Sequence, residues 1–476
     1  MNRIVNGRSS LARAIARFVV LACLVSVLPW AAKALAKDEA GDEVITLVIG
    51  LLGEKDKDLR SVGLDQIRTD AKGEAATRRF AAELPKLSPE AQAGLVSALA
   101  DRGDAAARPA IVALLGTTSD ETVKLATIAA VGSLGNVGDL PLLIDKAAKG
   151  SEAEQAVAVG AITRLRGEEV PRAIVATAKQ ATETPLRVTL IDILAERRAL
   201  DTVSDLVSLA RDPDAKVRAA AMGALAAMAG PGEIPGMIDG VLAAQKGAER
   251  TAAERAVAKV CSRIPDPAQQ AAPVLAAIEG HPPADRAVLL VTLARVGGPA
   301  ALEQVAAAIA DPARHDAGVP ALCAWPDASV APRLLDLFEH DAHPQHRAQA
   351  LAALIRVAPL DDGRSNDERL ALLKKVIGLC TRSEDQNQAI ERARAIYTVD
   401  SLRFVVPYLD QPEHVQSACD TVVELAHHRD IRDANKPEFM AALDRVLQLS
   451  KNDTTLERAN LYKAGKTWNR PKKADK

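Results

Sequence analysis

The chain has 476 residues, of which 60 are Lys or Arg and 62 are Asp or Glu, and its formal net charge is −2. Apolar residues make up 48% of the sequence, but aromatic residues only 2%. A near-neutral chain with few aromatic side chains and no basic stripe lacks the electrostatic surface that nucleic-acid binding requires, so no nucleic-acid partner is expected.

Residues 1–36 have the three-part pattern of a secretory signal peptide. Residues 1–17 contain four arginines and no acidic residue, and the apolar run from Phe18 to Leu28 is too short to span a bilayer. Ala34-Leu35-Ala36 offers a cleavage site, and its use would change the net charge from −2 to −7. We therefore predict an exported chain with no integral membrane segment after cleavage; the alternative is an amphipathic N-terminal helix.

Residues 202–230 show most clearly how the rest of the chain is organised. Apolar residues recur at helical spacing before and after the tripeptide Asp212-Pro213-Asp214, which predicts two short helices around a tight corner. Asp212 is the expected N-cap of the second helix, with Pro213 at its first position. Gly230 and Pro231 are expected to end that helix. A hairpin this short cannot cover both of its own faces and needs neighbours.

Similar corners recur along the chain at multiples of about 32 residues, a period typical of helical solenoids. A capping residue followed by proline marks them at Pro89, Pro185, Pro213, Pro283, Pro312, Pro344 and Pro412. The pattern predicts about thirteen helical pairs, whose first helices begin near Val44, Thr77, Ala106, Leu140, Val170, Thr202, Ile234, Ala271, Ala301, Val330, Asp367, Leu402 and Pro437. The predicted fold is an all-α solenoid over residues 37–464, followed by a disordered, Lys-rich tail over 465–476.

The segments 212–230 and 119–139, and more faintly 343–357 and 57–67, resemble HEAT repeats, particularly the short bacterial kind that also occurs in phycobilin lyases. The resemblance implies a right-handed superhelix with the second helices on its concave face. The resemblance says little about function, but a long curved surface made of many similar repeats suits extended contact with a protein partner. Some HEAT-like proteins are iron-dependent hydroxylases with repeated His-Glu pairs, but this chain contains no His-Glu dipeptide.

The repeat pattern is interrupted at residues 311–328. Gly318 and Pro320 fall where a second helix should be under way, so this helix is expected to be short and to begin late, near Val319. One interpretation is a local kink packed by Trp325, and the other is a seam at which Trp325 contacts a partner. A second irregularity, Asp361 to Arg369, is expected to be a long surface loop.

Four arginines, Arg218, Arg255, Arg286 and Arg347, recur early in second helices. Together with Trp325 they are the candidate partner-binding residues. Two interpretations remain open: the arginines form a basic ladder for an acidic partner, or each pairs with an acidic residue of its own or the next repeat, such as Asp214 with Arg218.

Two groups of residues have side chains suited to metal or redox chemistry. His340, His343 and His346 form an H-x-x-H-x-x-H pattern at a predicted corner, which could bind zinc with a water as fourth ligand or could consist of solvated corner residues. The cysteines after residue 36 are expected to be free and buried, because their spacings place most of them too far apart for a disulfide, and the alternative is a bridge between Cys380 and Cys419. They are Cys261, Cys323, Cys380 and Cys419.

These observations predict a non-enzymatic, exported HEAT-repeat scaffold that binds protein partners in the bacterial cell envelope, with no catalytic residue and no cofactor. No Walker loop, G-x-S-x-G, G-x-G-x-x-G or C-x-x-C motif is present. The alternative is a lyase-like or metal-dependent enzyme built on the same solenoid, with the interruption at 311–328 and the three histidines as its site.

Overall fold

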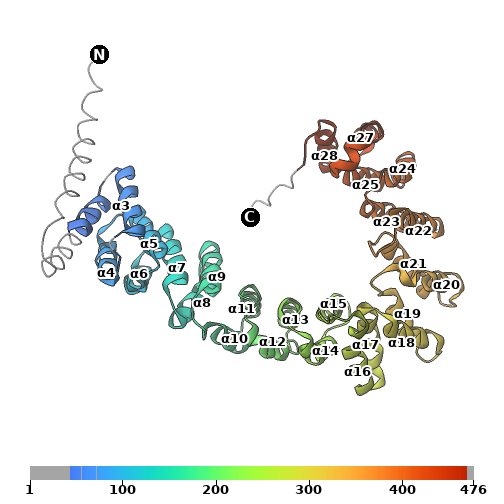
Figure 1. Cartoon of the computed structure of the whole chain (residues 1–476), viewed down its shortest axis with the longest axis horizontal. Coiled ribbons are helices and arrows are strands. Elements are labelled where there is room, and N and C mark those ends of the chain that lie inside the picture. The colour runs from blue at the N-terminus through green and yellow to red at the C-terminus, as the bar shows by residue number, and fades with distance from the viewer. Residues whose placement is uncertain (1–42, 55, 71, 469–476) are drawn as a thin grey trace, which may run out of the picture. The chain divides into compact units, whose positions relative to one another are not determined.

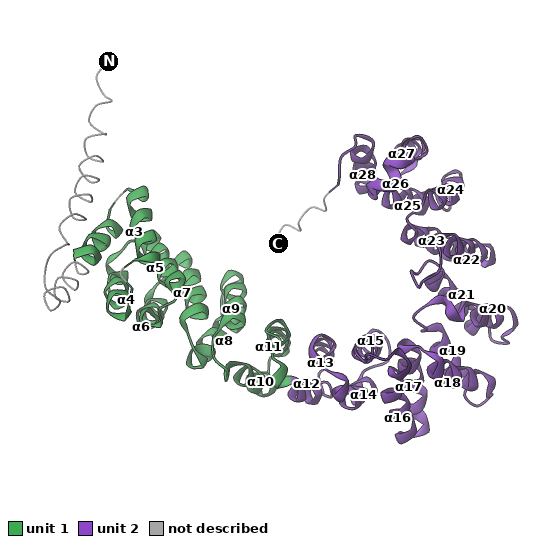
Figure 2. Ribbon diagram, viewed as in Figure 1, with its two compact units in different colours: residues 1–202 green, residues 203–476 purple. Residues whose placement is uncertain are grey.

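The computed structural model describes residues 43–54, 56–70 and 72–468. The predicted signal peptide and most of the predicted tail lie outside these ranges. The described chain consists of helices and contains no strand (Figure 1). It divides into unit 1, residues 1–202, and unit 2, residues 203–476, which are coloured separately in Figure 2.

Unit 1 is a stack of helical pairs. The first helices of its pairs are residues 43–52, α4 (Glu74–Ala81), α6 (Arg108–Thr117), α8 (Leu140–Lys149) and α10 (Val170–Gln180). The second helices are α3 (Lys57–Thr69), α5 (Pro89–Arg102), α7 (Glu121–Leu134), α9 (Glu152–Arg164) and α11 (Thr184–Glu196). Each second helix contacts the next, so together they form one layer of the stack.

Unit 2 repeats this arrangement. Its first helices are α12 (Val203–Leu209), α14 (Ile234–Ala243), α16 (Ala272–Gly280), α18 (Pro299–Ala310), α20 (Ala331–His340), α22 (Asn366–Leu379), α24 (Val399–Val405) and α27 (Lys436–Leu449). Its second helices are α13 (Ala215–Met228), α15 (Ala248–Cys261), α17 (Pro283–Val296), α19 (His315–Cys323), α21 (Pro344–Val357), α23 (Ser383–Arg392), α25 (Val415–His427) and α28 (Asp453–Lys463). A short helix, α26 (Arg429–Ala434), connects the last two pairs.

The predicted fold class, an all-α solenoid, is confirmed. The described residues form thirteen helical pairs, and the first helices begin at or close to the predicted residues. The starts at Leu140, Val170 and Ile234 agree, and the largest differences are at α4, which begins at Glu74, and α24, which begins at Val399. The repeat period was sufficient to predict where the helices begin, because it places one corner in every repeat. Helical hydrogen bonding is interrupted at each corner.

Small aliphatic side chains fill the space between the two helical layers. The buried positions are mostly Ala, Val, Leu and Ile. Close packing reaches the backbone at Gly132 of α7, where an added Cβ would lie 2.5 Å from the Cα of Ala161 in α9. Each unit therefore buries an apolar core with few aromatic side chains, as the composition predicted.

Arginines hydrogen-bond to backbone carbonyls that helix ends leave without an intrahelical partner. Within a pair, an arginine early in the second helix reaches back to the end of the first: Arg250 donates to Ala244 and Arg286 to His281. Between pairs, an arginine at the end of a second helix reaches the previous second helix: Arg197 donates to the carbonyl of Leu165. These bonds close the corners and connect successive repeats.

The predicted N-cap of α13 was wrong by two residues. The helix begins at Ala215, and Asp214 is its N-cap, because the Asp214 carboxylate accepts from the backbone N–H of Lys216 at 2.8 Å. Asp212 instead accepts from the backbone N–H of Asp214 at 2.9 Å. This local bond holds Pro213 in the turn that precedes the helix.

The predicted late start of the helix in the interrupted repeat was also wrong. α19 begins at His315, not near Val319, and continues through Gly318 and Pro320 to Cys323. The helix can begin early because Gly318 lets its first turn approach α18: an added Cβ would lie 2.8 Å from the backbone nitrogen of Ile309. It is nevertheless short, at nine residues.

The predicted surface loop over 361–369 is shorter than expected. α22 begins at Asn366, and Ser365 and Glu368 form a capping box in which each side chain bonds the backbone N–H of the other. Arg369 lies inside the helix and is buried, donating to the carbonyls of Pro359 and Ala395. The polar segment therefore contains a helix start in addition to a loop.

In the part of the chain that the structure describes, every helix is too short or too polar to cross a membrane.

A matched pair of glycine substitutions in unit 2 tests the close approach at α19. Gly318→Ala should lower the free energy of unfolding by about 1–3 kcal/mol, because the new methyl group collides with the Ile309 backbone. Gly223→Ala in α13 meets nothing within 4 Å and should raise it by about 0.5–1 kcal/mol. Urea unfolding followed by circular dichroism compares the two variants, and equal shifts would contradict the packing described here.

Candidate partner-binding groove and histidine cluster

A groove of about 960 Å³ runs over the consecutive second helices α15, α17, α19 and α21 of unit 2. These helices contact one another in order, and in Figure 2 they lie on the inner side of the curve that unit 2 follows. Half-buried Val288 and Val291 lie in the groove between charged side chains. We refer to this surface as the α15–α21 groove.

The α15–α21 groove carries an excess of positive charge in a chain that is slightly acidic overall. Five basic residues line it against two acidic residues, Glu254 and Asp316. The basic residues are Lys246, Arg250, Arg255, Arg295 and Arg356. Because Glu254 pairs with Arg295 at 2.7 Å and Asp316 is exposed, most of the positive charge in the groove lacks an acidic partner among the lining residues.

Arg356 lies close to other positive charges of this surface. Its guanidinium donates to the carbonyls of Cys323 and Trp325, at 3.0 and 2.6 Å. Burial lowers its pKa, and the nearby charges of Arg295, Arg392 and Arg255 lower it further. Several arginines therefore converge where an anionic group would relieve their mutual repulsion.

The four arginines predicted from the repeat pattern lie in different surroundings in the structure. Arg218 and Arg255 line a smaller groove of about 270 Å³ between α13 and α15, and Arg255 also lines the α15–α21 groove. Arg286 and Arg347 line neither groove, and each donates to a carbonyl of its own corner, Arg286 to His281 and Arg347 to Asp341.

Arg218 is buried and forms a two-armed ion pair with Glu249 of the next repeat, at 2.8 and 3.1 Å. It also donates to the carbonyls of Asp212 and Pro213. The prediction that these arginines pair with an acid of their own or the next repeat therefore holds for Arg218, with Glu249 as the partner in place of the suggested Asp214. Arg255 is exposed, and of the four it is the one that lines the α15–α21 groove.

Trp325 lies inside the stack, not on its surface. Its side chain is 2% exposed, and its indole N–H donates to the hydroxyl of Ser329 at 3.1 Å. The buried position of Trp325 agrees with the interpretation of a local kink. A direct contact between the indole ring and a partner would need the repeat to open, and the predicted role of Trp325 in partner binding stays a prediction.

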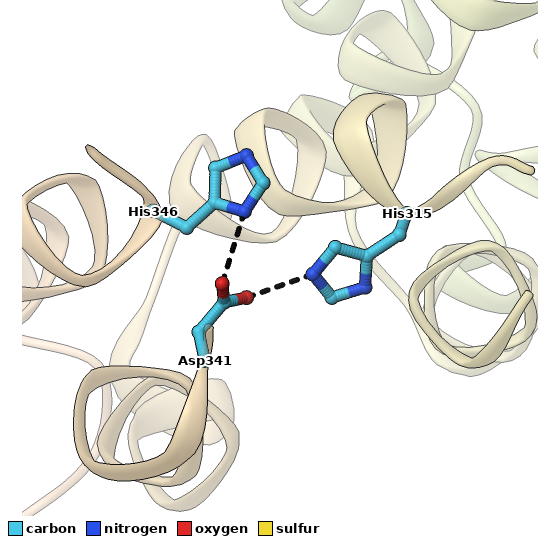
Figure 3. A group of neighbouring side chains, drawn as sticks. All are labelled: His315, Asp341 and His346. Carbon is cyan, nitrogen blue, oxygen red and sulfur yellow. Dashed lines mark hydrogen bonds and ion pairs between the residues drawn. The ribbon is translucent and has the colours of Figure 1, made fainter. Parts of the chain in front are cut away.

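A group of side chains that could bind a metal ion lies beside the α15–α21 groove. His315, Asp341 and His346 converge from the start of α19, the end of α20 and the first turns of α21, as Figure 3 shows. One potential ligand atom of each residue lies within 4.8 Å of the others. We call these three residues the His–Asp–His cluster.

Asp341 is the centre of the cluster, with a side chain only 1% exposed. One carboxylate oxygen lies 2.7 Å from His315 Nε2, and the other lies 3.2 Å from His346 Nδ1. The backbone N–H of His343 also donates to it at 2.8 Å. His315 Nδ1 lies 2.7 Å from the carbonyl oxygen of Ile309, which orients the ring.

The predicted trio His340, His343 and His346 is only partly brought together. The His340 side chain is 71% exposed and contacts Asp336 at 3.1 Å, away from the cluster. His343 stays near, with Nδ1 3.4 Å from Asp341. Sequence reasoning missed His315 and the central role of Asp341. A usable signal existed, because His315 and His346 lie 31 positions apart, one repeat, near the starts of successive second helices.

The cluster shifts the pKa values of two of its members. Burial alone would raise the pKa of Asp341, but the hydrogen bonds from the His343 backbone, His315 and His346 outweigh it and lower the pKa to about 2. The pKa of His315 is raised, first by the hydrogen bond to Ile309 and then by that to Asp341. The folded state therefore favours a carboxylate beside a protonated imidazole.

Cys261, Cys323, Cys380 and Cys419 are free in the structure, as predicted. All except Cys323, which is half-buried in the α15–α21 groove, are buried. Burial raises the pKa of Cys323 to about 12 and that of each of the others to about 11. These thiols are therefore poor nucleophiles at neutral pH.

Comparison with known proteins supports the repeat interpretation. Residues 77–163 and 171–258 match the model of HEAT repeats. The HEAT-repeat prediction is therefore confirmed for these two segments, which together cover less than half of the chain. A search of curated proteins finds no match.

Solved structures show a distant likeness in fold. The crystal structure of Kap121p bound to Nup53p aligns with a TM-score of 0.42 at 11% identity, covering 88% of this chain and 55% of that one. A crystal structure of importin beta aligns with a TM-score of 0.34 at 12% identity, covering 89% of this chain and 66% of that one. The chain thus spans between half and two thirds of these larger proteins, and the likeness concerns the fold alone.

The cluster predicts a pH-dependent contribution to stability. The Asp341 contribution is present above about pH 4 and is lost as the pH falls towards 2, whereas the His315 contribution is present below about pH 6.5 and is lost as the pH rises through its elevated pKa. In the presence of a chelator, Asp341→Asn should therefore lower the free energy of unfolding by about 2 kcal/mol at pH 5.5 and by less at pH 8.5.

The matched control is Asp336→Asn, which removes the exposed partner of His340. It should change the free energy of unfolding little at either pH, because exposed pairs contribute at most about 1 kcal/mol. Urea unfolding at both pH values provides the comparison. The same cost for Asp341→Asn at both pH values would show that His315 is not protonated beside it.

Proposed function

We propose that this protein is a non-enzymatic scaffold, exported to the bacterial cell envelope, that binds an acidic segment of a partner protein in the α15–α21 groove. The observation that carries the proposal is the convergence of Arg250, Arg255, Arg295 and Arg356 over successive second helices. A negatively charged segment would complement these residues.

The groove suits an extended segment better than a small molecule. It is an open surface that crosses four second helices in succession, and helices in such stacks lie about 8–10 Å apart. A partner crossing all four would span roughly 30 Å, which corresponds to about nine residues of extended chain. The half-buried Val288 and Val291 would contact apolar side chains between the acidic ones.

Arg255 provides the sharpest test of the groove. Arg255→Glu should weaken binding of the partner about tenfold or more, because it places a repulsive charge in the path of an acidic segment. Arg333→Glu is the matched control, since Arg333 is also exposed but lies on the first helix α20. Binding should also weaken with added salt.

The measurement begins with photo-crosslinking in the native envelope. A crosslinking amino acid at Gln349, which is exposed and lines the groove, should capture one reproducible protein, identified by mass spectrometry. The same amino acid at position 333 should not capture that protein. Its affinity is then measured with the purified pair. Equal crosslinking at both positions, or equal affinity of the Arg255→Glu and Arg333→Glu variants, would reject the groove as the binding surface.

Export is supported by the pattern of the first 36 residues, with four arginines, an apolar run and the Ala34-Leu35-Ala36 site. We expect the chain recovered from cells to begin at Lys37, as determined by N-terminal sequencing, and to fractionate with the envelope. Deletion of residues 2–36 should retain the chain in the cytoplasm. A chain in the cytoplasm with residues 1–36 still attached would contradict export.

A further inference from the structure

We propose that His315, Asp341 and His346 form a binding site for one zinc ion, with His343 or a water as fourth ligand. The site fastens α19 of one repeat to α20 and α21 of the next, beside the α15–α21 groove. It differs from the trio expected from sequence, because His340 is outside it and His315 and Asp341 are inside.

The donor set favours zinc over magnesium or calcium. Imidazoles and carboxylates are among the ligands that zinc binds in proteins, whereas magnesium and calcium prefer oxygen ligands alone. The three potential ligand atoms already lie within 4.8 Å of one another. Tetrahedral zinc, with bonds of about 2.0–2.2 Å, holds neighbouring ligand atoms roughly 3.4 Å apart, so the side chains need to move by about an ångström or less.

The hydrogen bonds around His315 require a positive charge at its contact with Asp341. The Ile309 carbonyl can only accept a hydrogen bond, so His315 Nδ1, at 2.7 Å, carries a proton. In the neutral ring this leaves a lone pair on Nε2, 2.7 Å from a carboxylate oxygen that also can only accept. A second proton on Nε2 bridges the two atoms at this distance, and a zinc ion would take its place once they move apart to about 3.4 Å.

Several features favour the metal ion over a proton alone. The Ile309 carbonyl presents Nε2 of His315 to the site, in the way that backbone carbonyls commonly orient histidines that bind metals. Two further imidazoles are close: the ring of His346 lies 5.4 Å from that of His315 and 4.9 Å from that of His343, measured between centroids. A proton shared with Asp341 requires only one imidazole, whereas three imidazoles lie close to Asp341 here.

The zinc site adjoins the α15–α21 groove and would hold two of its helices together. Asp316 follows His315 directly and lines the α15–α21 groove, and α19 and α21 both contribute lining residues to it. α19 is also the short helix with an internal proline. A zinc ion that joins its first residue to the corner of the next repeat would hold the two helices in one relative position.

The test uses the full chain, freed of metal with a chelator and then titrated with Zn²⁺ by calorimetry. We expect one zinc ion per chain. His315→Ala and His346→Ala should each weaken binding about tenfold or more, and His340→Ala, the matched control, should bind as the unaltered chain does. Circular dichroism establishes that each variant is folded.

A second measurement on the unaltered chain does not depend on the folding of variants. X-ray absorption of the zinc-loaded protein should show nitrogen and oxygen ligands at about 2.0–2.2 Å with imidazole scattering. Sulfur ligands at about 2.3 Å would place the zinc on cysteines and overturn the proposal. Absence of binding, or equal binding by the His315→Ala and His340→Ala variants, would also overturn it and leave a proton alone between His315 and Asp341.

Discussion

The structure depends on hydrogen bonds to the carbonyls that each short helix leaves unpaired at its end. A stack of helical pairs contains many such ends, and each unpaired carbonyl that is buried would cost stability. Arginines satisfy them, within a pair as Arg250 does for Ala244, and between pairs as Arg197 does for Leu165 and Arg356 does for Trp325. The bonds of Arg197 and Arg356 also join successive second helices to one another.

This use of arginine also shapes the surface proposed to bind a partner. Arg356 donates to a carbonyl at the end of α19, and this position also places its positive charge in the α15–α21 groove. Arg218 and Arg286 reach carbonyls of their own corners. A recurring arginine in this sequence therefore indicates a repeat corner first, and its position in the folded stack decides whether it also faces a groove.

The His–Asp–His cluster is a variation on the same corner. Asp341 occupies the end of a first helix, where its carboxylate accepts from the backbone N–H of His343. Histidines of two successive repeats then meet at this carboxylate, because His315 and His346 lie one repeat apart. Arg347 donates to the Asp341 carbonyl, as arginines do at other corners, and the same corner also holds the side chains proposed to bind zinc.

The sequence by itself determined the helical pairs, their number and most of their starting residues, because apolar periodicity and corner residues are local signals. It also indicated free cysteines, but it left open whether Trp325 packs inside a kinked repeat or lies on the surface, and the structure shows it buried. Only the tertiary structure decided that α19 starts at His315, since this depends on the space that Gly318 leaves beside Ile309. It likewise decided which arginines and histidines meet, because residues one repeat apart become neighbours only when the helices stack.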